Sequence, residues 1–247
     1  MEHAFFNYSY WYRWRRLGLD PESPPTVECD SIQLVGESRS RVYIHAKITT
    51  SANGKLLFRQ NISYIFSSDG TVKVRTFTHP TGLLRNAASL PRIGYSLCIN
   101  NNLTGIIYLG RGPGENYPDR KAGSDLGMWS TSPKSMGYEY IVPCENGNRS
   151  DCSWALFRSE TRPSDGFMIV AADDSSKEGF HFSALLHSQS ELHRATHTHQ
   201  LEDREEGEHP IYVNLDLDAM GIGGDVGWSP CVYEDYQLKP TKAYNSR

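Results

Sequence analysis

The sequence predicts an all-β fold, an antiparallel β-sandwich of many strands, and three observations support this expectation. β-Branched and aromatic residues gather in runs of strand length. Polar or Gly/Pro-rich stretches separate these runs at regular spacing. No internal repeat and no linker divides the 247 residues. We therefore expect a single domain over residues 1–247, with 1–25 as a short aromatic and helical N-terminal segment.

The first elements predict a short helix followed by an antiparallel meander. "YSYWYRWRRLGL" (8–19) is typical of a short amphipathic helix, and the "DPESPP" after it predicts its end. "RVYIHAKITT" (41–50), "KLLFRQNISYIF" (55–66) and "TVKVRTFTH" (71–79) predict three strands, with "SANG" and "SSDG" as the turns between them. Further strands are predicted at 92–100, 104–110, 153–160, 166–172, 180–188, 210–217 and 230–238.

Charge and composition exclude several classes of protein. The net charge of −4 gives no electrostatic case for a nucleic acid or an anionic membrane as partner. No apolar run approaches the roughly 18 residues that cross a bilayer, and the first residues do not resemble a signal peptide. Five cysteines without a CxxC spacing predict free, buried thiols, although Cys144 and Cys152 could pair in an oxidising compartment. We expect a cytoplasmic protein without a cofactor.

The densest polar stretch is "GRGPGENYPDRKAGSDLGMW", within the Gly-, Pro-, Asn- and Asp-rich segment 111–152. We expect that segment to be a long loop, and loops of such length usually carry function or belong to an interface. Its carboxylates and amides can hydrogen-bond sugar hydroxyls. Alternatively, Asp119 and Arg120 pair with each other or with the backbone and stiffen the loop. The candidate ligand-binding residues here are Asn116, Asp119 and Arg120, next to Glu115.

A second polar stretch, "CENGNRSD" (144–151), contains an Asn-Gly pair that predicts a tight turn. Glu145, Arg149 and Asp151 surround this turn. An arginine between two carboxylates commonly braces a loop, so we expect an ion-pair set with a structural role.

The stretch "ELHRATHTHQLEDREEGEH" holds four histidines. On a helix, His193 and His197 would share one face; on a strand, His197 and His199 would share one instead. Neither spacing completes a metal-binding motif, so we expect no metal site. If the protein performs acid–base chemistry, the expected catalytic groups are His197 or His199 with Glu115 or Glu145, because an imidazole titrates near neutral pH.

The stretch "VNLDLDAMGIGGDVGWSP" (213–230) runs from a strand pattern into four glycines, Asp225 and Trp228. Glycines give little side-chain cover, so the indole of Trp228 can offer a flat apolar face to the C–H groups of a sugar. Polar groups of the 115–120 region would orient such a ligand. The alternative is a tryptophan that closes the end of the sandwich, since Trp is highly buried on average.

Five motifs occur in one order along the chain: "LPRIGYSL", "GRGPGENYPDRKAG", "YIVPCENGNRSD", the His/Glu segment and "MGIGGDVGWSP". In this order they resemble the small-chain domain of large bacterial-type β-galactosidases. The resemblance implies a β-supersandwich of the galactose-mutarotase-like type. It also implies that the Trp of the Gly-Gly-Asp-x-x-Trp motif, Trp228 here, contacts substrate, with Asp225 as the aspartate of that motif. Val226 and Gly227 stand where the family often has Asp and Ser.

In that family the catalytic acid and nucleophile are glutamates of a separate TIM-barrel domain, and the small-chain domain lends a loop to the edge of the site. The sequence contains no such barrel, so we expect no hydrolysis by this chain alone. The resemblance implies a carbohydrate-binding protein or subunit beside a large catalytic chain. The alternatives are a stand-alone isomerase, lyase or cyclase with His/Glu chemistry, and a binding module without chemistry. The expected partners are a carbohydrate or other small molecule, and a large catalytic chain or further copies of this chain.

Overall fold

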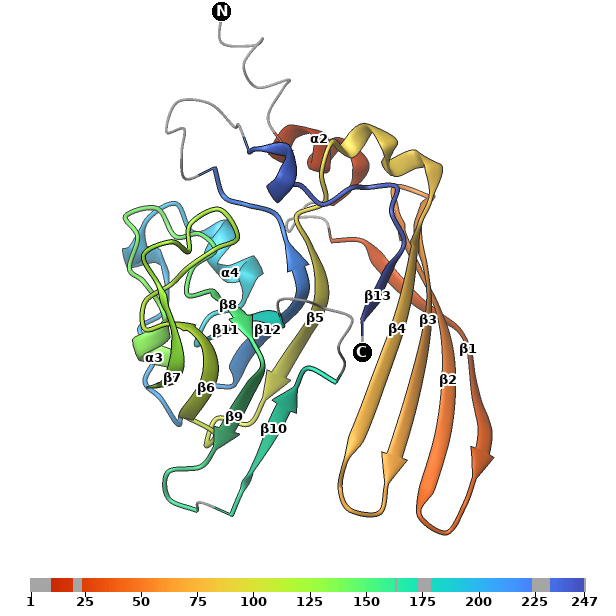
Figure 1. Cartoon of the computed structure of the whole chain (residues 1–247). Helices are drawn as coiled ribbons and strands as arrows, with labels where there is room; N and C mark the ends of the chain where they lie inside the picture. The colour runs from red at the N-terminus through yellow and green to blue at the C-terminus, as the bar shows by residue number, and fades with distance from the viewer. Residues whose placement is uncertain (1–9, 20–23, 163, 173–178, 224–231, 247) are drawn as a thin grey trace, which may run out of the picture. The chain divides into compact units, whose positions relative to one another are not determined.

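The computed structural model of the chain (Figure 1) describes residues 10–19, 24–162, 164–172, 179–223 and 232–246. Antiparallel strands dominate these residues, so the predicted all-β class is confirmed. The chain forms two compact units, one of residues 10–90 with 237–246 and one of residues 91–223 with 232–236. A single domain over 1–247 stays a prediction. None of the helices in the described part of the chain is long and apolar enough to cross a membrane.

The first unit is a five-stranded antiparallel sheet with a short helix. The helix, α2 (Tyr10–Leu17), matches the predicted one, and the indole N–H of Trp14 donates a hydrogen bond to the carbonyl of Ser89 at 2.7 Å. The turn at "SANG" has positive φ at both Asn53 (51°) and Gly54 (71°), as a tight hairpin requires. The sheet has the order β1 (Thr26–Glu37), β2 (Arg41–Ala52), β3 (Lys55–Ser67), β4 (Val72–Pro80) and β13 (Tyr244–Ser246), and a 3₁₀ helix, η1 (Gly82–Ala87), follows β4.

The second unit contains two four-stranded antiparallel sheets and several short helices. The first sheet has the order β10 (Gly166–Val170), β9 (Trp154–Arg158), β6 (Gly105–Gly112) and β7 (Asp125–Thr131). The second has the order β5 (Arg92–Ile99), β12 (Ile211–Ala219), β11 (Phe180–Leu185) and β8 (Arg149–Cys152). The short helices are α3 (Pro133–Met136), α4 (Gln189–Arg194), η2 (Thr198–Gln200) and η3 (Glu234–Tyr236).

One hydrophobic core joins the inner faces of these two sheets and makes the unit a sandwich. Alternate residues of β6 and β9 are fully buried, because a strand turns successive side chains to opposite faces. They meet aromatic and aliphatic residues of the other sheet; Tyr108, for example, packs edge-on against Phe182 with ring centroids 5.3 Å apart. The core contributed by the four central strands consists of Ile106, Tyr108, Ala155, Phe157, Phe182, Ala184, Ile211 and Val213.

One strand prediction and one loop prediction were wrong. The strand expected at 230–238 is absent from its described residues, where 234–236 form the 3₁₀ helix η3. Residues 111–152 are not one continuous loop, because they contain β7, α3 and β8. The sequence also gave no signal for β1 and β13, since β1 is an edge strand with exposed residues on both faces and β13 has three residues.

The cysteines differ in burial from the expectation. Cys29, Cys98 and Cys144 are exposed, and Cys152 is the buried one among the described cysteines. All four are free thiols, so Cys144 and Cys152 do not form the pair considered for an oxidising compartment. Burial raises the pKa of the Cys152 thiol, with a further contribution from the nearby Asp151 carboxylate, and keeps this sulfur protonated and unreactive.

Candidate ligand-binding site

The polar loop that follows β6 is held in place by Asn116, which is completely buried. Its amide nitrogen donates to the carbonyls of Arg111 and Gly114, each at 3.0 Å. Its amide oxygen accepts from the N–H of Ser150 at 2.8 Å. The side chain therefore has no group left for a ligand, and Asn116 supports the loop from inside.

Glu115 is a buried anion at the centre of a second set of hydrogen bonds. Its carboxylate accepts from the N–H of Gly147 at 2.9 Å, from the hydroxyl of Tyr140 and from the guanidinium of Arg120. Burial alone would raise the pKa of Glu115, but the hydrogen bonds from Tyr140, Gly147 and Arg120 hold it below its usual value. Glu115 is thus ionised at neutral pH and serves as a fixed acceptor rather than a proton donor.

Arg120 pairs with Glu115 and not with Asp119. Its guanidinium also lies over the ring of Tyr117, 5.3 Å from the centroid. The Arg120 side chain nevertheless remains 45% exposed, so part of it is open to a ligand. Of the predicted binding residues in this loop, Arg120 has the most accessible charge.

Asp119 connects the polar loop to the glycine-rich stretch that follows β12. Its two carboxylate oxygens accept from the N–H groups of Ile222 at 3.0 Å and Gly223 at 2.7 Å. The contact requires glycine at 221, where a Cβ would lie 2.6 Å from the Asp119 carboxylate. Two motifs about 100 residues apart in sequence thus meet at Asp119. The alternative in which Asp119 pairs with the backbone is the observed one.

Asp225 and Trp228, the remaining predicted ligand contacts, lie outside the described residues. In sequence they follow Gly223 by two and five positions. The Asp119 contact therefore fixes the backbone immediately before the part of the chain that carries both.

The expected ion-pair set around the second turn does not form. Arg149 is buried and donates to the hydroxyl of Tyr108 at 3.1 Å and to the carbonyl of Gly147 at 2.9 Å. Asp151 pairs instead with Lys121 at 2.8 Å and with Arg111. The prediction was wrong because β8 is irregular: its register shifts against β11, and Asp151 has a φ of 57°. This irregularity breaks the strand alternation that would otherwise place Arg149 and Asp151 on one face.

Glu145 belongs to a different cluster, centred on Arg92 at the start of β5. Arg92 forms an ion pair with Glu145 and lies 3.4 Å from the carboxylate of Asp216 on β12. Gly94, opposite Asp216 in the sheet, leaves the space that this carboxylate needs, since a Cβ there would lie 2.4 Å from its oxygen. Burial raises the pKa of Asp216 to about 6, against the opposing effect of Arg92.

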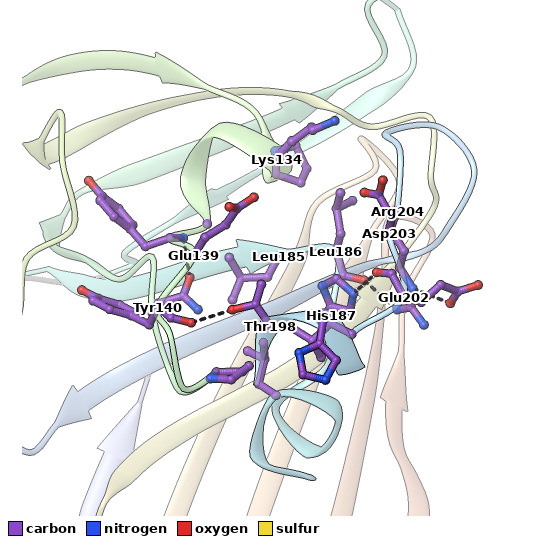
Figure 2. Close-up of a pocket in the computed structure, with 18 residues that line it drawn as sticks. Lys134, Glu139, Tyr140, Leu185, Leu186, His187, Thr198, Glu202, Asp203 and Arg204 are labelled. Atoms are coloured by element: carbon purple, nitrogen blue, oxygen red, sulfur yellow. Dashed lines mark hydrogen bonds and ion pairs between the residues drawn. The ribbon is translucent and has the colours of Figure 1, made fainter. Parts of the chain in front are cut away.

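An open depression of about 720 Å³ lies in the second unit and is lined by residues between Pro133 and Arg204 (Figure 2). Leu185, Leu186 and Leu192 contribute apolar surface to it. Tyr138 and Tyr140 line another part, with their rings stacked at a centroid distance of 6.2 Å. A depression with apolar and aromatic surface and a charged rim is the usual form of a small-molecule site.

Of the site residues that were predicted from sequence and that the structure describes, His199 lines this depression. His197 and His199 are not on a strand or a long helix; they lie at the 3₁₀ helix η2, with ring centroids 5.5 Å apart. Between them, the hydroxyl of Thr198 donates to the carbonyl of Tyr140 at 3.0 Å (Figure 2). Tyr140 in turn binds Glu115, so it stands between the histidine segment and that carboxylate.

Among the described residues, no group of three or more His, Cys, Asp or Glu side chains could hold a metal ion. Sequence reasoning missed Tyr140, Arg92 and Asp216. The alternating "NLDLD" of β12 places both aspartates on the face opposite the leucines, so the pattern alone did not mark Asp216 as buried. No local signal identified the partners of Arg92, which are about 50 and 120 residues away.

Comparison with known proteins confirms the resemblance read from the ordered motifs. The family model for the "Beta galactosidase small chain" matches residues 6–247. A β-galactosidase of Pseudoalteromonas haloplanktis is 33% identical over 234 residues, which cover 94% of this chain and 20% of the relative. β-Galactosidases of Enterobacter cloacae and Psychromonas ingrahamii are each 31% identical over 92% of this chain, and over 20% and 19% of their own length. The chain spans about a fifth of the length of these relatives, and it belongs to the β-galactosidase small chain family.

Proposed function

We propose that the chain binds carbohydrate and acts as the small-chain component of a β-galactosidase, beside a large catalytic region. In this role it supplies a binding loop, and the catalytic region supplies the acid and the nucleophile of hydrolysis. The proposal rests on membership of the family and on the fact that the chain spans about a fifth of its relatives. Glycoside hydrolysis needs two carboxylates on either side of one bond, and the carboxylates of the described polar loop are engaged elsewhere.

The observation that carries the proposal is the contact between Asp119 and the N–H groups of Ile222 and Gly223. A binding loop must hold its ligand contacts in one geometry, because ordering a loose loop would oppose binding. Asp119 anchors the backbone before Asp225 and Trp228. Arg120, which is partly exposed next to this anchor, supplies a charged donor for sugar hydroxyls.

The acid–base alternative has less support. Glu115 is ionised and engaged by three donors, and Glu145 is paired with Arg92. A general acid or base must reach the proton that it transfers, and within the described part of the chain neither carboxylate hydrogen-bonds to His197 or His199. These four residues as catalytic groups stay a prediction.

The purified chain is expected to show no appreciable hydrolysis of an aryl β-galactoside, since it lacks the barrel glutamates. The measurement is a turnover assay with a nitrophenyl β-galactoside, alone and with the large chain of a two-chain β-galactosidase. Activity that appears only with both chains supports the small-chain role. Turnover of about 1 s⁻¹ or more by the chain alone, the range of ordinary enzymes, contradicts it.

Trp228→Ala and Asp119→Ala should each weaken the binding of lactose by about tenfold or more, corresponding to ~1.4 kcal/mol. The first removes the proposed stacking surface; the second releases the anchored backbone before it. Calorimetric titration of each variant measures the affinity, and a melting curve on the same sample measures stability. Asp125→Ala is the matched control, because Asp125 is an exposed aspartate of the same segment.

A different outcome is expected if Trp228 only fills space in the protein. Trp228→Ala would then lower the free energy of unfolding by about 3–5 kcal/mol and leave the affinity of the folded fraction unchanged. That result would reject the tryptophan as a sugar platform. Equal affinities of Asp119→Ala and Asp125→Ala would reject the anchoring role of Asp119.

A further inference from the structure

The sheet β10-β9-β6-β7 of the second unit has an unusual outer face. Its inner face packs into the core through residues such as Tyr108 and Phe157. Because side chains alternate along a strand, the residues between these core positions point to the other side of the sheet. An antiparallel sheet with one face on the core normally carries polar residues on the other face, where it meets water.

The strand register shows that the centre of this outer face is mainly apolar instead. Residues paired directly across antiparallel strands lie on the same face. Met128, Leu109, Trp154 and Val170 form one continuous row across all four strands. A second row contains Ser130, Ile107, Leu156 and Met168. Beyond the two rows, Leu126 lies opposite Arg111 at one end, and Arg158 lies between two glycines at the other. Figure 1 shows the four strands next to one another.

This outer face, made of eight apolar residues on four strands, is accessible. Leu126, Met128, Met168 and Val170 are between 52% and 71% exposed. Two arginines border the apolar rows: Arg111 pairs with Asp151 and donates to the carbonyl of Ser124 at 3.0 Å, and Arg158 is exposed at the end of β9. Contiguous exposed apolar surface of this kind marks an interaction site. An apolar centre with charged residues at its border resembles the arrangement of a protein–protein interface.

We propose that this outer face is the surface by which the chain docks onto the catalytic region of a β-galactosidase. The inference rests on the proposed function. The relatives are about five times longer than the part that this chain matches, so in them a small-chain domain is accompanied by a much larger body of protein. A partner with an apolar surface fits the two apolar rows at the centre of this face, whereas a sugar or a nucleic acid would require polar groups there.

The test uses the full chain and the separately expressed large chain of a two-chain β-galactosidase as its probe. The double variant Leu126→Glu/Met128→Glu places two negative charges on the outer face. Its affinity for the large chain should therefore fall by about 100-fold or more. Ile141→Glu/Val142→Glu is the matched control. It makes the same change in charge at two exposed apolar residues of the same unit that lie outside the face, and its affinity should equal that of the wild type.

Folding is checked by circular dichroism and by a melting curve for each variant. If Leu126→Glu/Met128→Glu does not fold, Met168→Glu/Val170→Glu at the opposite edge strand replaces it, with the same expected loss. Wild-type affinity in a folded face variant, or an equal loss in the control, would overturn the inference and leave the proposed function standing. Absence of any complex with the wild-type chain would overturn both. If the wild type self-associates through this face and the face variants are monomeric, the occupant is a second copy and the inference is wrong.

Discussion

Replacing Phe157 with alanine is expected to lower the free energy of unfolding by about 3–5 kcal/mol, the usual cost of removing a buried aromatic ring. Phe157 is completely buried between the two sheets of the second unit. Its ring stacks on Phe167 at a centroid distance of 5.2 Å and meets Phe182 edge-on at 6.1 Å. The variant therefore loses the transfer energy of the ring and leaves a cavity that its neighbours cannot close without shifting.

Urea denaturation followed by far-ultraviolet circular dichroism measures this loss. Phe66→Ala is the matched control: it removes the same ring from a position on β3 that is 41% exposed. Because this ring leaves water only in part, the control should lose far less stability. Similar losses for the two variants would mean that Phe157 does not occupy the core between the sheets.

The strands that sequence alone predicts well are those with one buried and one outward face. Burial alternates along β9 and along β6 from Ile106 onward, and the predicted ranges 104–110 and 153–160 match these strands closely. The period of two residues is a local property of a strand, so it can be read without knowing the partner strand. Most outer residues of both strands are also apolar, which departs from the usual polar outer face. Only the register between the strands shows that these residues form one continuous face.

β7 and the segments after it show where such reasoning ends. "DLGMWST" lies in a Gly-rich stretch, and it becomes a strand because β6 offers it a complementary edge. That edge is a tertiary feature, which local propensity does not encode. The histidine segment behaves similarly: His197 and His199 were read as helix or strand positions, but Gln200 and neighbouring side chains cap a 3₁₀ helix there.

The polar loop was predictable as a group and not as pairs. The sequence suggested that Asp119 and Arg120 pair with each other or with the backbone. Asp119 does bind the backbone, but Arg120 pairs with Glu115. The Glu115 carboxylate accepts from the N–H of Gly147, 32 residues away, and the Asp119 carboxylate accepts from the N–H of Ile222, 103 residues away. Only the fold brings these donors to the loop, so the sequence left the alternatives open.

Asp216 gives the protein a buried acid whose ionisation opposes folding. It is 2% exposed, and its pKa is about 6 in the folded protein compared with an ordinary value of 3.8. Burial is the main cause, and the carboxylates of Glu145 and Asp218 add to it, while Arg92 acts in the opposite direction. Between about pH 4 and pH 6 the folded protein therefore binds more protons at this site than the unfolded protein does. This group's contribution to stability is present below pH 4 and is lost as the pH rises through 6.

Asp216→Asn is expected to remove this pH dependence, because the amide stays neutral at every pH and keeps the shape of the side chain. Arg92 retains Glu145 as its partner. The stability of the variant relative to the wild type should therefore rise between pH 4 and pH 7, by about 3 kcal/mol for a pKa difference of about two. Urea denaturation of both proteins at half-unit steps of pH measures the difference, in which the contributions of all other carboxylates cancel. In the exposed control Asp125→Asn the same difference should stay flat, since that carboxylate is not taken out of water on folding. A flat profile for Asp216→Asn as well would mean that Arg92 fully compensates the burial of Asp216, and that this ion pair, not a partly protonated acid, stands between β5 and β12.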